Sequence, residues 1–241
     1  MDSSKKTMAM RDDEQAAGGA GPATGLRSRK KARRHEEILD QARALFSEKG
    51  VDAVTMAEIA EAAGVSTPTV FNYFGNKDGI LIAMITDGAQ NARDNSKVME
   101  PRTDVDFLST LMTVFMDISV ETMEIASKRI WRYANAAAIR HSESEFARSF
   151  QDVDAALIGV IEAILGRYSL TLHDGSAGDA RHIAQLLFDV WLSTFQVFVG
   201  VQEMTIEAHE DKLRARFAPL CKMIFAPEFL ARPTLADAAP H

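Results

Sequence analysis

The sequence predicts an all-α protein, and three observations support this fold class. Apolar side chains recur every three to four residues through almost all of residues 34–231, which is the period of an amphipathic helix. No segment shows the alternation typical of a strand, and no internal repeat is visible. Seven prolines among 241 residues leave room for long helices, and the hydrophobic content of 46% is sufficient for a core.

We divide the chain into four parts. Residues 1–26 include AAGGAGPATG and almost no large apolar side chains, so we expect a disordered tail. Residues 27–80 are predicted to form a small helical domain with a basic arm. Residues 81–231 are predicted to form a larger helical domain, and residues 232–241 a frayed tail.

The first predicted helices lie close together. Residues 34–49 place Ile38, Ala42 and Phe46 on one face and stop at Gly50. The second helix begins at a capping box, in which the hydroxyl of Thr55 accepts a backbone N–H and Glu58 reaches back to the Thr55 amide.

This second helix ends at Gly64, where the missing Cβ permits a tight turn. Ser66 or Thr67 then caps a third helix, and Pro68 stands in its first turn. Two short helices joined by such a turn form a helix-turn-helix.

The third helix, in VSTPTVFNYFGNK (residues 65–77), has an unusual outer face. Its expected core-facing stripe is Val70, Phe71 and Phe74. Its opposite arc shows the uncharged, hydrogen-bonding side chains of Thr69, Asn72 and Tyr73. Such a face suits base edges in a major groove, although an ordinary helical hairpin with an incidental polar face is the alternative.

The distribution of charge favours nucleic acid as a partner. The net charge of −7 argues against it, yet RSRKKARR at residues 27–34 holds six basic side chains. Such a run is either a solvated tail or a source of phosphate contacts, and its place beside a helix favours the second. The candidate residues are Arg29, Lys30, Lys31, Arg33 and Arg34.

Residues 36–84, EEILDQARALFSEKGVDAVTMAEIAEAAGVSTPTVFNYFGNKDGILIAM, resemble the N-terminal domain of TetR-family transcriptional regulators. The resemblance implies an all-α homodimer with a three-helix DNA-binding domain and a larger ligand-binding and dimerisation domain. It also implies that Thr55 meets the DNA backbone and Lys77 a phosphate. Further contacts are implied for Ser66, Thr67, Pro68, Thr69, Asn72 and Tyr73. Phe71 stands where a tyrosine is frequent, so one phosphate contact is missing.

The larger domain is predicted to contain helices over residues 77–99, 104–119, 125–139, 146–165, 183–201 and 207–224, with a loop at 173–179. Helix 183–201 is apolar almost all round, so it needs cover on two sides. Gln185, Asp189 and Gln196 interrupt it, which argues against a membrane span. We expect its own core on one side and a second subunit on the other. The predicted dimer-interface residues are Ile183, Leu186, Leu187, Val190, Thr194, Phe198, Val201, Leu213, Phe217 and Leu220.

Aromatic and methionine side chains are plentiful in the larger domain, and they are either plain core or the wall of a deformable apolar pocket. The candidate ligand-binding residues are Met112, Phe115, Met116, Trp131, Asn135, Phe146, Phe150, Phe188, Trp191 and Phe195. We expect no catalytic motif, no metal site and no cofactor. Cys221 is expected to be a core residue, with redox sensing as the alternative, and a single cysteine favours a reducing cytoplasm.

The sequence therefore predicts a DNA-binding repressor that works as a homodimer on a palindromic operator. Its two recognition helices would lie roughly 34–36 Å apart, and a small apolar or amphipathic effector would release it. Two rivals stay open. One is a ligand-independent architectural DNA-binding protein, and the other is an all-α small-molecule-binding protein or enzyme.

Overall fold

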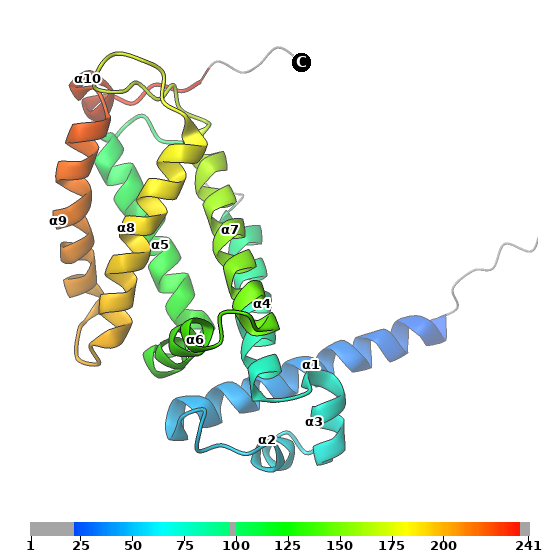
Figure 1. Ribbon diagram of the computed structural model, residues 1–241. Coiled ribbons are helices and arrows are strands. Elements are labelled where there is room, and N and C mark those ends of the chain that lie inside the picture. The colour runs from blue at the N-terminus through cyan, green and yellow to red at the C-terminus, as the bar shows by residue number, and fades with distance from the viewer. Residues whose placement is uncertain (1–21, 97–99, 237–241) are drawn as a thin grey trace, which may run out of the picture. The chain divides into compact units, whose positions relative to one another are not determined.

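The computed structural model describes residues 22–96 and 100–236, and this part of the chain is almost entirely helical, which confirms the predicted fold class (Figure 1). The helices are α1 (Pro22–Lys49), α2 (Met56–Ala62), α3 (Thr67–Phe74), α4 (Lys77–Ser96), α5 (Phe107–Ile125), α6 (Lys128–Arg140), α7 (Glu145–Leu165), α8 (Ala180–Gly200), α9 (Ile206–Ile224) and α10 (Pro227–Ala231). Within the described ranges, β-structure is limited to isolated bridges such as Tyr168 with Leu235.

The chain divides into two compact units, Met1–Glu36 and Glu37–His241. The described part of the first unit is the beginning of α1 and carries the basic run. Here the prediction was wrong, because residues 22–33 are helical although the helix was expected from residue 34 and residues 22–26 were expected to be disordered. Arg, Lys and Ala are strong helix formers and α1 contains no proline after Pro22, so the helix extends through the run. The rest of the predicted tail lies outside the described residues.

The second unit begins with the helix-turn-helix. Ile38 and Phe46 of α1, Ile59 of α2 and Val70 of α3 are all completely buried in one core. The capping box at Thr55 is confirmed, and Ser66 caps α3 through its side chain. Positive φ at Gly64 makes the turn between α2 and α3, as its missing Cβ permits.

A helical bundle completes the second unit. Helix α4 leads from the helix-turn-helix into this bundle, where it packs against α5 and α7 (Figure 1). Helix α8 packs against α6, α7 and α9, and α5 also packs against α9. The predicted domain boundary at residue 80 falls inside α4, and the predicted end of that helix at residue 99 lies outside the described residues.

The start of the C-terminal tail is ordered, which corrects the expectation that residues 232–241 are frayed. The amide of Ser169 donates to the carbonyl of Thr234 at 2.8 Å, and that of Ala236 donates to Arg167 at 3.0 Å. Pro233 is buried. Backbone hydrogen bonds and burial thus fix residues 232–236, while residues 237–241 lie outside the described part.

One described helix, α8, is long and apolar enough to cross a membrane by length and composition alone. Half of its most apolar window is buried inside the protein, as in the core helix of a bundle. Cys221 is likewise a core residue, and burial raises the pKa of its thiol to about 12, so it is inert.

Candidate DNA-binding surface and ligand cavity

The outer face of α3 carries the residues that the sequence predicts to contact DNA bases. Pro68 and Asn72 are exposed, and Thr67, Thr69 and Tyr73 are partly exposed. The side chains of this face bear no charge, so they offer hydrogen-bond donors and acceptors without the ion pairs that a solvated helix usually forms.

Two of the predicted contact residues already use their hydroxyl groups in helix caps. Thr55 Oγ1 accepts from the Glu58 amide at 3.2 Å, and the Thr55 amide donates to Glu58 Oε2 at 2.8 Å. The hydrogen bonds that the Glu58 carboxylate accepts from Thr55 and from Lys49 lower its pKa to about 2. Ser66 Oγ accepts from the Thr69 amide at 3.4 Å. The two caps fix the starts of α2 and α3, and both residues remain exposed.

Phe71 does not belong to the core stripe in which the sequence placed it. Its side chain is 48% exposed, whereas Val70 is completely buried and Phe74 nearly so. Successive residues turn by about 100° around a helix. Val70 and Phe74, which are four residues apart, therefore share the buried face, whereas Phe71 points away from it. The exposed face of α3 therefore includes an aromatic ring.

Lys77 has a structural use that the sequence did not indicate. Its Nζ donates to the carbonyl of Val51 at 2.7 Å and to that of Asp52 at 3.2 Å. The first residue of α4 thus fixes the loop that precedes α2 by two hydrogen bonds. These bonds use two of the three ammonium hydrogens, so at most one remains for the phosphate contact implied by the resemblance.

The basic residues of the first unit lie on α1. Arg29, Lys30, Lys31 and Arg33 are exposed, and Arg34 is partly exposed. At about 100° per residue these positions cover an arc of roughly 200°, so the run presents a broad basic face along the helix.

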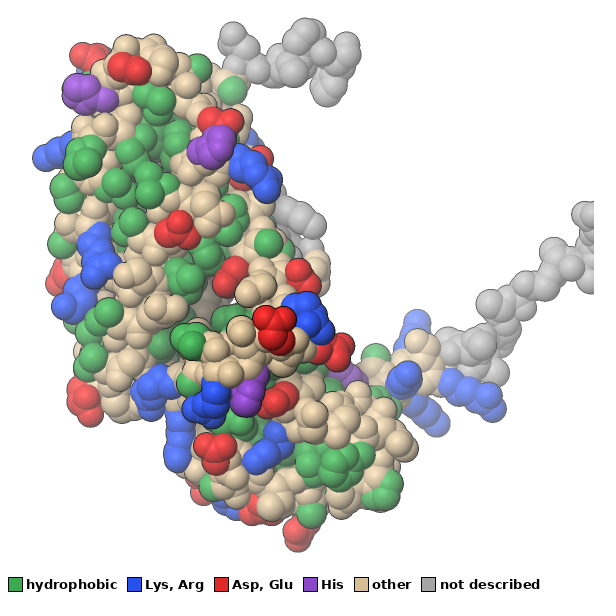
Figure 2. Space-filling model, viewed as in Figure 1, with side chains coloured by type: hydrophobic (Ala, Val, Ile, Leu, Met, Phe, Trp, Pro, Cys, Tyr) green, Lys and Arg blue, Asp and Glu red, His purple; other side chains and the backbone are tan. Residues whose placement is uncertain are grey.

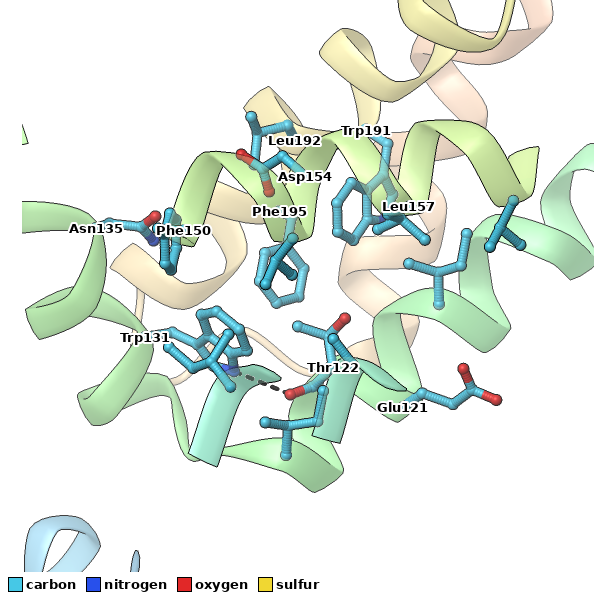
Figure 3. Close-up of a pocket in the computed structure, with 16 residues that line it drawn as sticks. Glu121, Thr122, Trp131, Asn135, Phe150, Asp154, Leu157, Trp191, Leu192 and Phe195 are labelled. Carbon is cyan, nitrogen blue, oxygen red and sulfur yellow. Dashed lines mark hydrogen bonds between the residues drawn. The ribbon is translucent and has the colours of Figure 1, made fainter. Parts of the chain in front are cut away.

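The bundle encloses a cavity of about 70 Å³ between α4, α5, α6, α7 and α8 (Figure 3). Among the predicted ligand-binding residues, Trp131, Asn135, Phe150, Trp191 and Phe195 line it. Their rings pack together. The Trp131 ring centroid lies 6.2 Å from those of Phe150 and Phe195, and Trp191 stacks on Phe195 at 5.0 Å.

The other predicted ligand-binding residues do not line this cavity. They are Met112, Phe115, Met116, Phe146 and Phe188. Phe115 is completely buried and meets Phe217 of α9 edge to face at 4.9 Å, and Phe146 is buried and stacks on Phe150 at 5.8 Å. These side chains are core, which was the alternative interpretation of the pattern.

Several lining residues were missed, and they are Ile85, Ala89, Ile118, Glu121, Thr122, Ile125, Val153, Asp154, Leu157, Val160 and Leu192. Asp154 is the notable omission, because burial raises the pKa of its carboxyl to about 6. The sequence did contain a signal. An acid at residue 154 lies one turn after Phe150 and interrupts the apolar stripe that Val153 and Leu157 continue.

A buried polar network adjoins the cavity. Trp191 Nε1–H donates to Ser119 Oγ at 2.9 Å, and Ser119 in turn donates to the carbonyl of Phe115 at 2.8 Å. Ser119 Oγ then accepts from His209 Nε2 at 3.0 Å, which assigns the ring proton to Nε2. Burial, and secondarily Lys128, lower the pKa of His209 to about 4.

Arginines connect the cavity region to the end of α1. Arg43 Nε donates to the carbonyl of Ile125, a cavity residue, at 3.0 Å. Arg129 of α6 donates to the last carbonyls of α1, those of Glu48 and Lys49, at 2.8 Å each. Gly50 makes this approach possible, because a Cβ there would lie 2.7 Å from the Arg129 guanidinium.

The predicted dimer-interface residues fall into two groups. Ile183, Leu187, Thr194, Phe198, Leu213 and Phe217 are buried inside the single chain, so they cannot form an outer surface. The prediction was wrong for them because an all-round apolar helix gives no sign of which side its own chain covers. Leu186 and Val201 are 41% and 43% exposed, and Val190 and Leu220 are partly exposed. Val197 and Met223, which the prediction omitted, are also exposed on α8 and α9.

Known proteins resemble this chain in both sequence and fold. The sequence pattern of the bacterial regulatory proteins of the tetR family matches residues 38–84. The HTH-type transcriptional regulator BetI of Rhizobium meliloti is 40% identical over 63 residues, which are 26% of this chain and only 31% of BetI. An uncharacterized HTH-type transcriptional regulator of Mycobacterium tuberculosis is 27% identical over 66% of this chain and 78% of its own length.

Solved structures extend the likeness to the bundle. The FadR repressor of Thermus thermophilus, solved in complex with lauroyl-CoA, superposes with a TM-score of 0.55 over 86% of this chain and 99% of its own, at 20% identity. At that identity the likeness concerns the fold alone. Residues 38–84 thus carry the sequence pattern of the tetR family of bacterial regulatory proteins, and the described helices share the fold of a solved TetR-family repressor.

Proposed function

We propose that the protein is a cytoplasmic, homodimeric regulator that binds a palindromic DNA operator and is released by a small effector in the bundle cavity. Helix α3 would enter the major groove, with Thr69, Asn72 and Tyr73 toward the bases and the capped helix starts toward the backbone. The basic run of α1 would add phosphate contacts that are independent of sequence.

The observation that carries this proposal is that the same elements bound the cavity and hold the helix-turn-helix. Helix α4 lines the cavity with Ile85 and Ala89, and its Lys77 forms a hydrogen bond with the loop before α2. Ile125 also lines the cavity, and its carbonyl accepts the hydrogen bond from Arg43 of α1. A ligand that displaces the cavity wall therefore acts on residues that orient the DNA-binding part.

The outer side of α8 and α9 is the proposed dimer surface. Leu186, Val197 and Met223 are large apolar side chains with exposed fractions of 41%, 42% and 74%. Hydrophobic side chains gather over these two helices on the face that Figure 2 presents. Pairing α8 and α9 of two subunits would cover them. The lauroyl-CoA bound to the Thermus FadR supports an effector site within this fold.

The test combines operator selection with a coupling variant. Duplexes selected from random DNA should yield a palindrome, and a cavity ligand should release it. Arg129→Ala removes both bonds to the end of α1, so we expect operator affinity to stay and ligand-induced release to weaken. Arg140→Ala, an exposed arginine on the same helix, is the matched control. Recovery of random sequences without a palindrome would contradict the proposal.

A further inference from the structure

The cavity wall brings aromatic rings and carboxylates together. Trp131, Phe195 and Trp191 supply ring faces and edges, and Phe150 extends the group. Asp154 of α7 lines the same space among these rings (Figure 3). A wall built only to hold a neutral apolar molecule would not need an acid at this position.

The carboxylate of Asp154 lacks a cationic partner within the described part of the chain. None of the cavity-lining residues described here is Lys, Arg or His. The hydrogen bonds and ion pairs found among described residues do not include the Asp154 side chain. The other polar groups in the wall are Asn135, Thr122 and Glu121, none of which carries positive charge.

An unpaired carboxylate in an apolar cavity costs free energy, because the charged form loses its hydration without compensation. The raised pKa of Asp154, which has burial as its cause, reflects this cost. A bound cation would restore the compensation. Aromatic faces also attract cations through the ring quadrupole, and most strongly where water is excluded.

We propose that the cavity binds a compact hydrophobic cation, whose positive group lies against Asp154 and the aromatic rings and whose apolar body contacts Ile118 and Leu157. This inference rests on the proposed function of the cavity as the effector site and names the chemical class of the effector. Most of the residues that line the cavity are apolar, which suits the apolar body of such a molecule.

Other ligand classes fit the wall less well. A neutral apolar molecule would seal the Asp154 carboxylate away from water without a counter-ion. An anionic ligand, such as a fatty acid, would be repelled by both Asp154 and Glu121. Glu121 lies at the edge of the group, with its carboxylate pointing away from the labelled rings (Figure 3). It is therefore placed to attract a cation toward the cavity rather than to hold it.

The test uses the full-length protein at pH 8 and three probes of matched shape. They are benzyltrimethylammonium, its neutral carbon analogue neopentylbenzene, and the anion phenylacetate. Binding is followed by the emission of Trp131 and Trp191, the two tryptophans of the chain, and by thermal stabilisation. We expect the cation to bind most tightly and the anion least.

The decisive variant is Asp154→Asn, which keeps the shape of the side chain and removes its charge. It should weaken binding of the cation about 10- to 100-fold and leave the neutral analogue unaffected or bound more tightly. Asp152 is an exposed acid on the same helix, so Asp152→Asn is the matched control. It should change the binding of neither the cation nor the neutral analogue. Melting curves of both variants verify that they fold.

Several outcomes would overturn the inference. They are equal or tighter binding of the neutral analogue to the unmodified protein, undiminished binding of the cation by Asp154→Asn, and failure of all three probes to bind. Measurement of operator affinity separates this inference from the proposed function. Cation binding without release of DNA would support the cation site and contradict the effector role. Release of DNA by neutral compounds alone would support the effector role and contradict the cation site.

Discussion

The helix-turn-helix and the bundle bury their interiors in different ways. The helix-turn-helix core consists of apolar side chains such as Ile38, Phe46 and Ile59, each without exposed surface. The bundle also buries Ser119 and His209 and leaves a cavity beside them. The first arrangement holds α3 against a tightly packed apolar core, and the second leaves unfilled space in the interior of the bundle.

The largest expected difference between the two regions concerns truncation of a core side chain. Phe46→Ala should cost ~3–5 kcal/mol of unfolding free energy and abolish DNA binding, because the tight core has no way to fill the void. Leu157→Ala, beside the existing cavity, should cost clearly less. Chemical denaturation and a DNA-binding assay measure both, and equal losses would show that the bundle is packed as tightly as the helix-turn-helix.

On the DNA-binding side, Asn72→Ala should weaken operator binding by ~1–3 kcal/mol and leave the melting temperature unchanged, because the side chain is exposed. Binding to random duplexes serves as the control and should hardly change. Equal losses on both kinds of DNA would mean that Asn72 contacts the backbone rather than a base.

In the cavity wall, the stability effect of Asp154 should depend on pH. Its folded pKa of about 6 lies above the ordinary value of 3.8, so the folded state holds the proton more tightly. Stability is therefore lost as pH rises from about 4 through about 6, and the full penalty is present above that range. Asp154→Asn should stabilise the ligand-free protein at pH 8 by ~1–2 kcal/mol and have no effect near pH 3. Thermal melts at the two pH values measure this, and equal gains at both would exclude ionisation as the cause.

The smallest effect is expected for Phe71→Tyr. The ring is exposed, and the resemblance to the TetR family implies that a tyrosine is frequent at this position, so a hydroxyl there should add a phosphate contact worth ~0.5–1 kcal/mol. The gain should appear on operator and random duplexes alike. A gain confined to the operator would indicate that residue 71 faces a base.

The accuracy of the sequence predictions differs between the same two regions. Local signals define the helix-turn-helix: a capping box at Thr55, a turn glycine at Gly64 and a cap at Ser66 each act within a few residues of the chain. Such signals are visible in the sequence because the interactions they describe are themselves local. The burial of Phe71 was misjudged there, and the hydrogen bonds of Lys77 to the loop before α2 were not foreseen.

The cavity depends on which faces of five helices meet, and periodicity cannot specify this. Trp131 and Phe115 look alike in the sequence, yet one lines the cavity and the other packs against α9. The proposed dimer surface poses the same difficulty, since Leu186 and Leu187 are neighbours in the sequence and, of the two, Leu187 is buried. Tertiary packing, rather than propensity, decides these positions.

Lys128 has a consequence for how the protein responds to acidity. Its ammonium donates to the carbonyls of Val201 and Met204 between α8 and α9 and lies 4.0 Å from the Phe198 ring centroid. Its positive charge adds to burial in lowering the pKa of His209 to about 4, far below the range in which histidines usually act as switches. The imidazole beside the cavity therefore stays neutral from mildly acidic to alkaline conditions. Near pH 6 the charge of Asp154 in the cavity wall should therefore change, while the His209 imidazole in the polar network beside the cavity stays neutral.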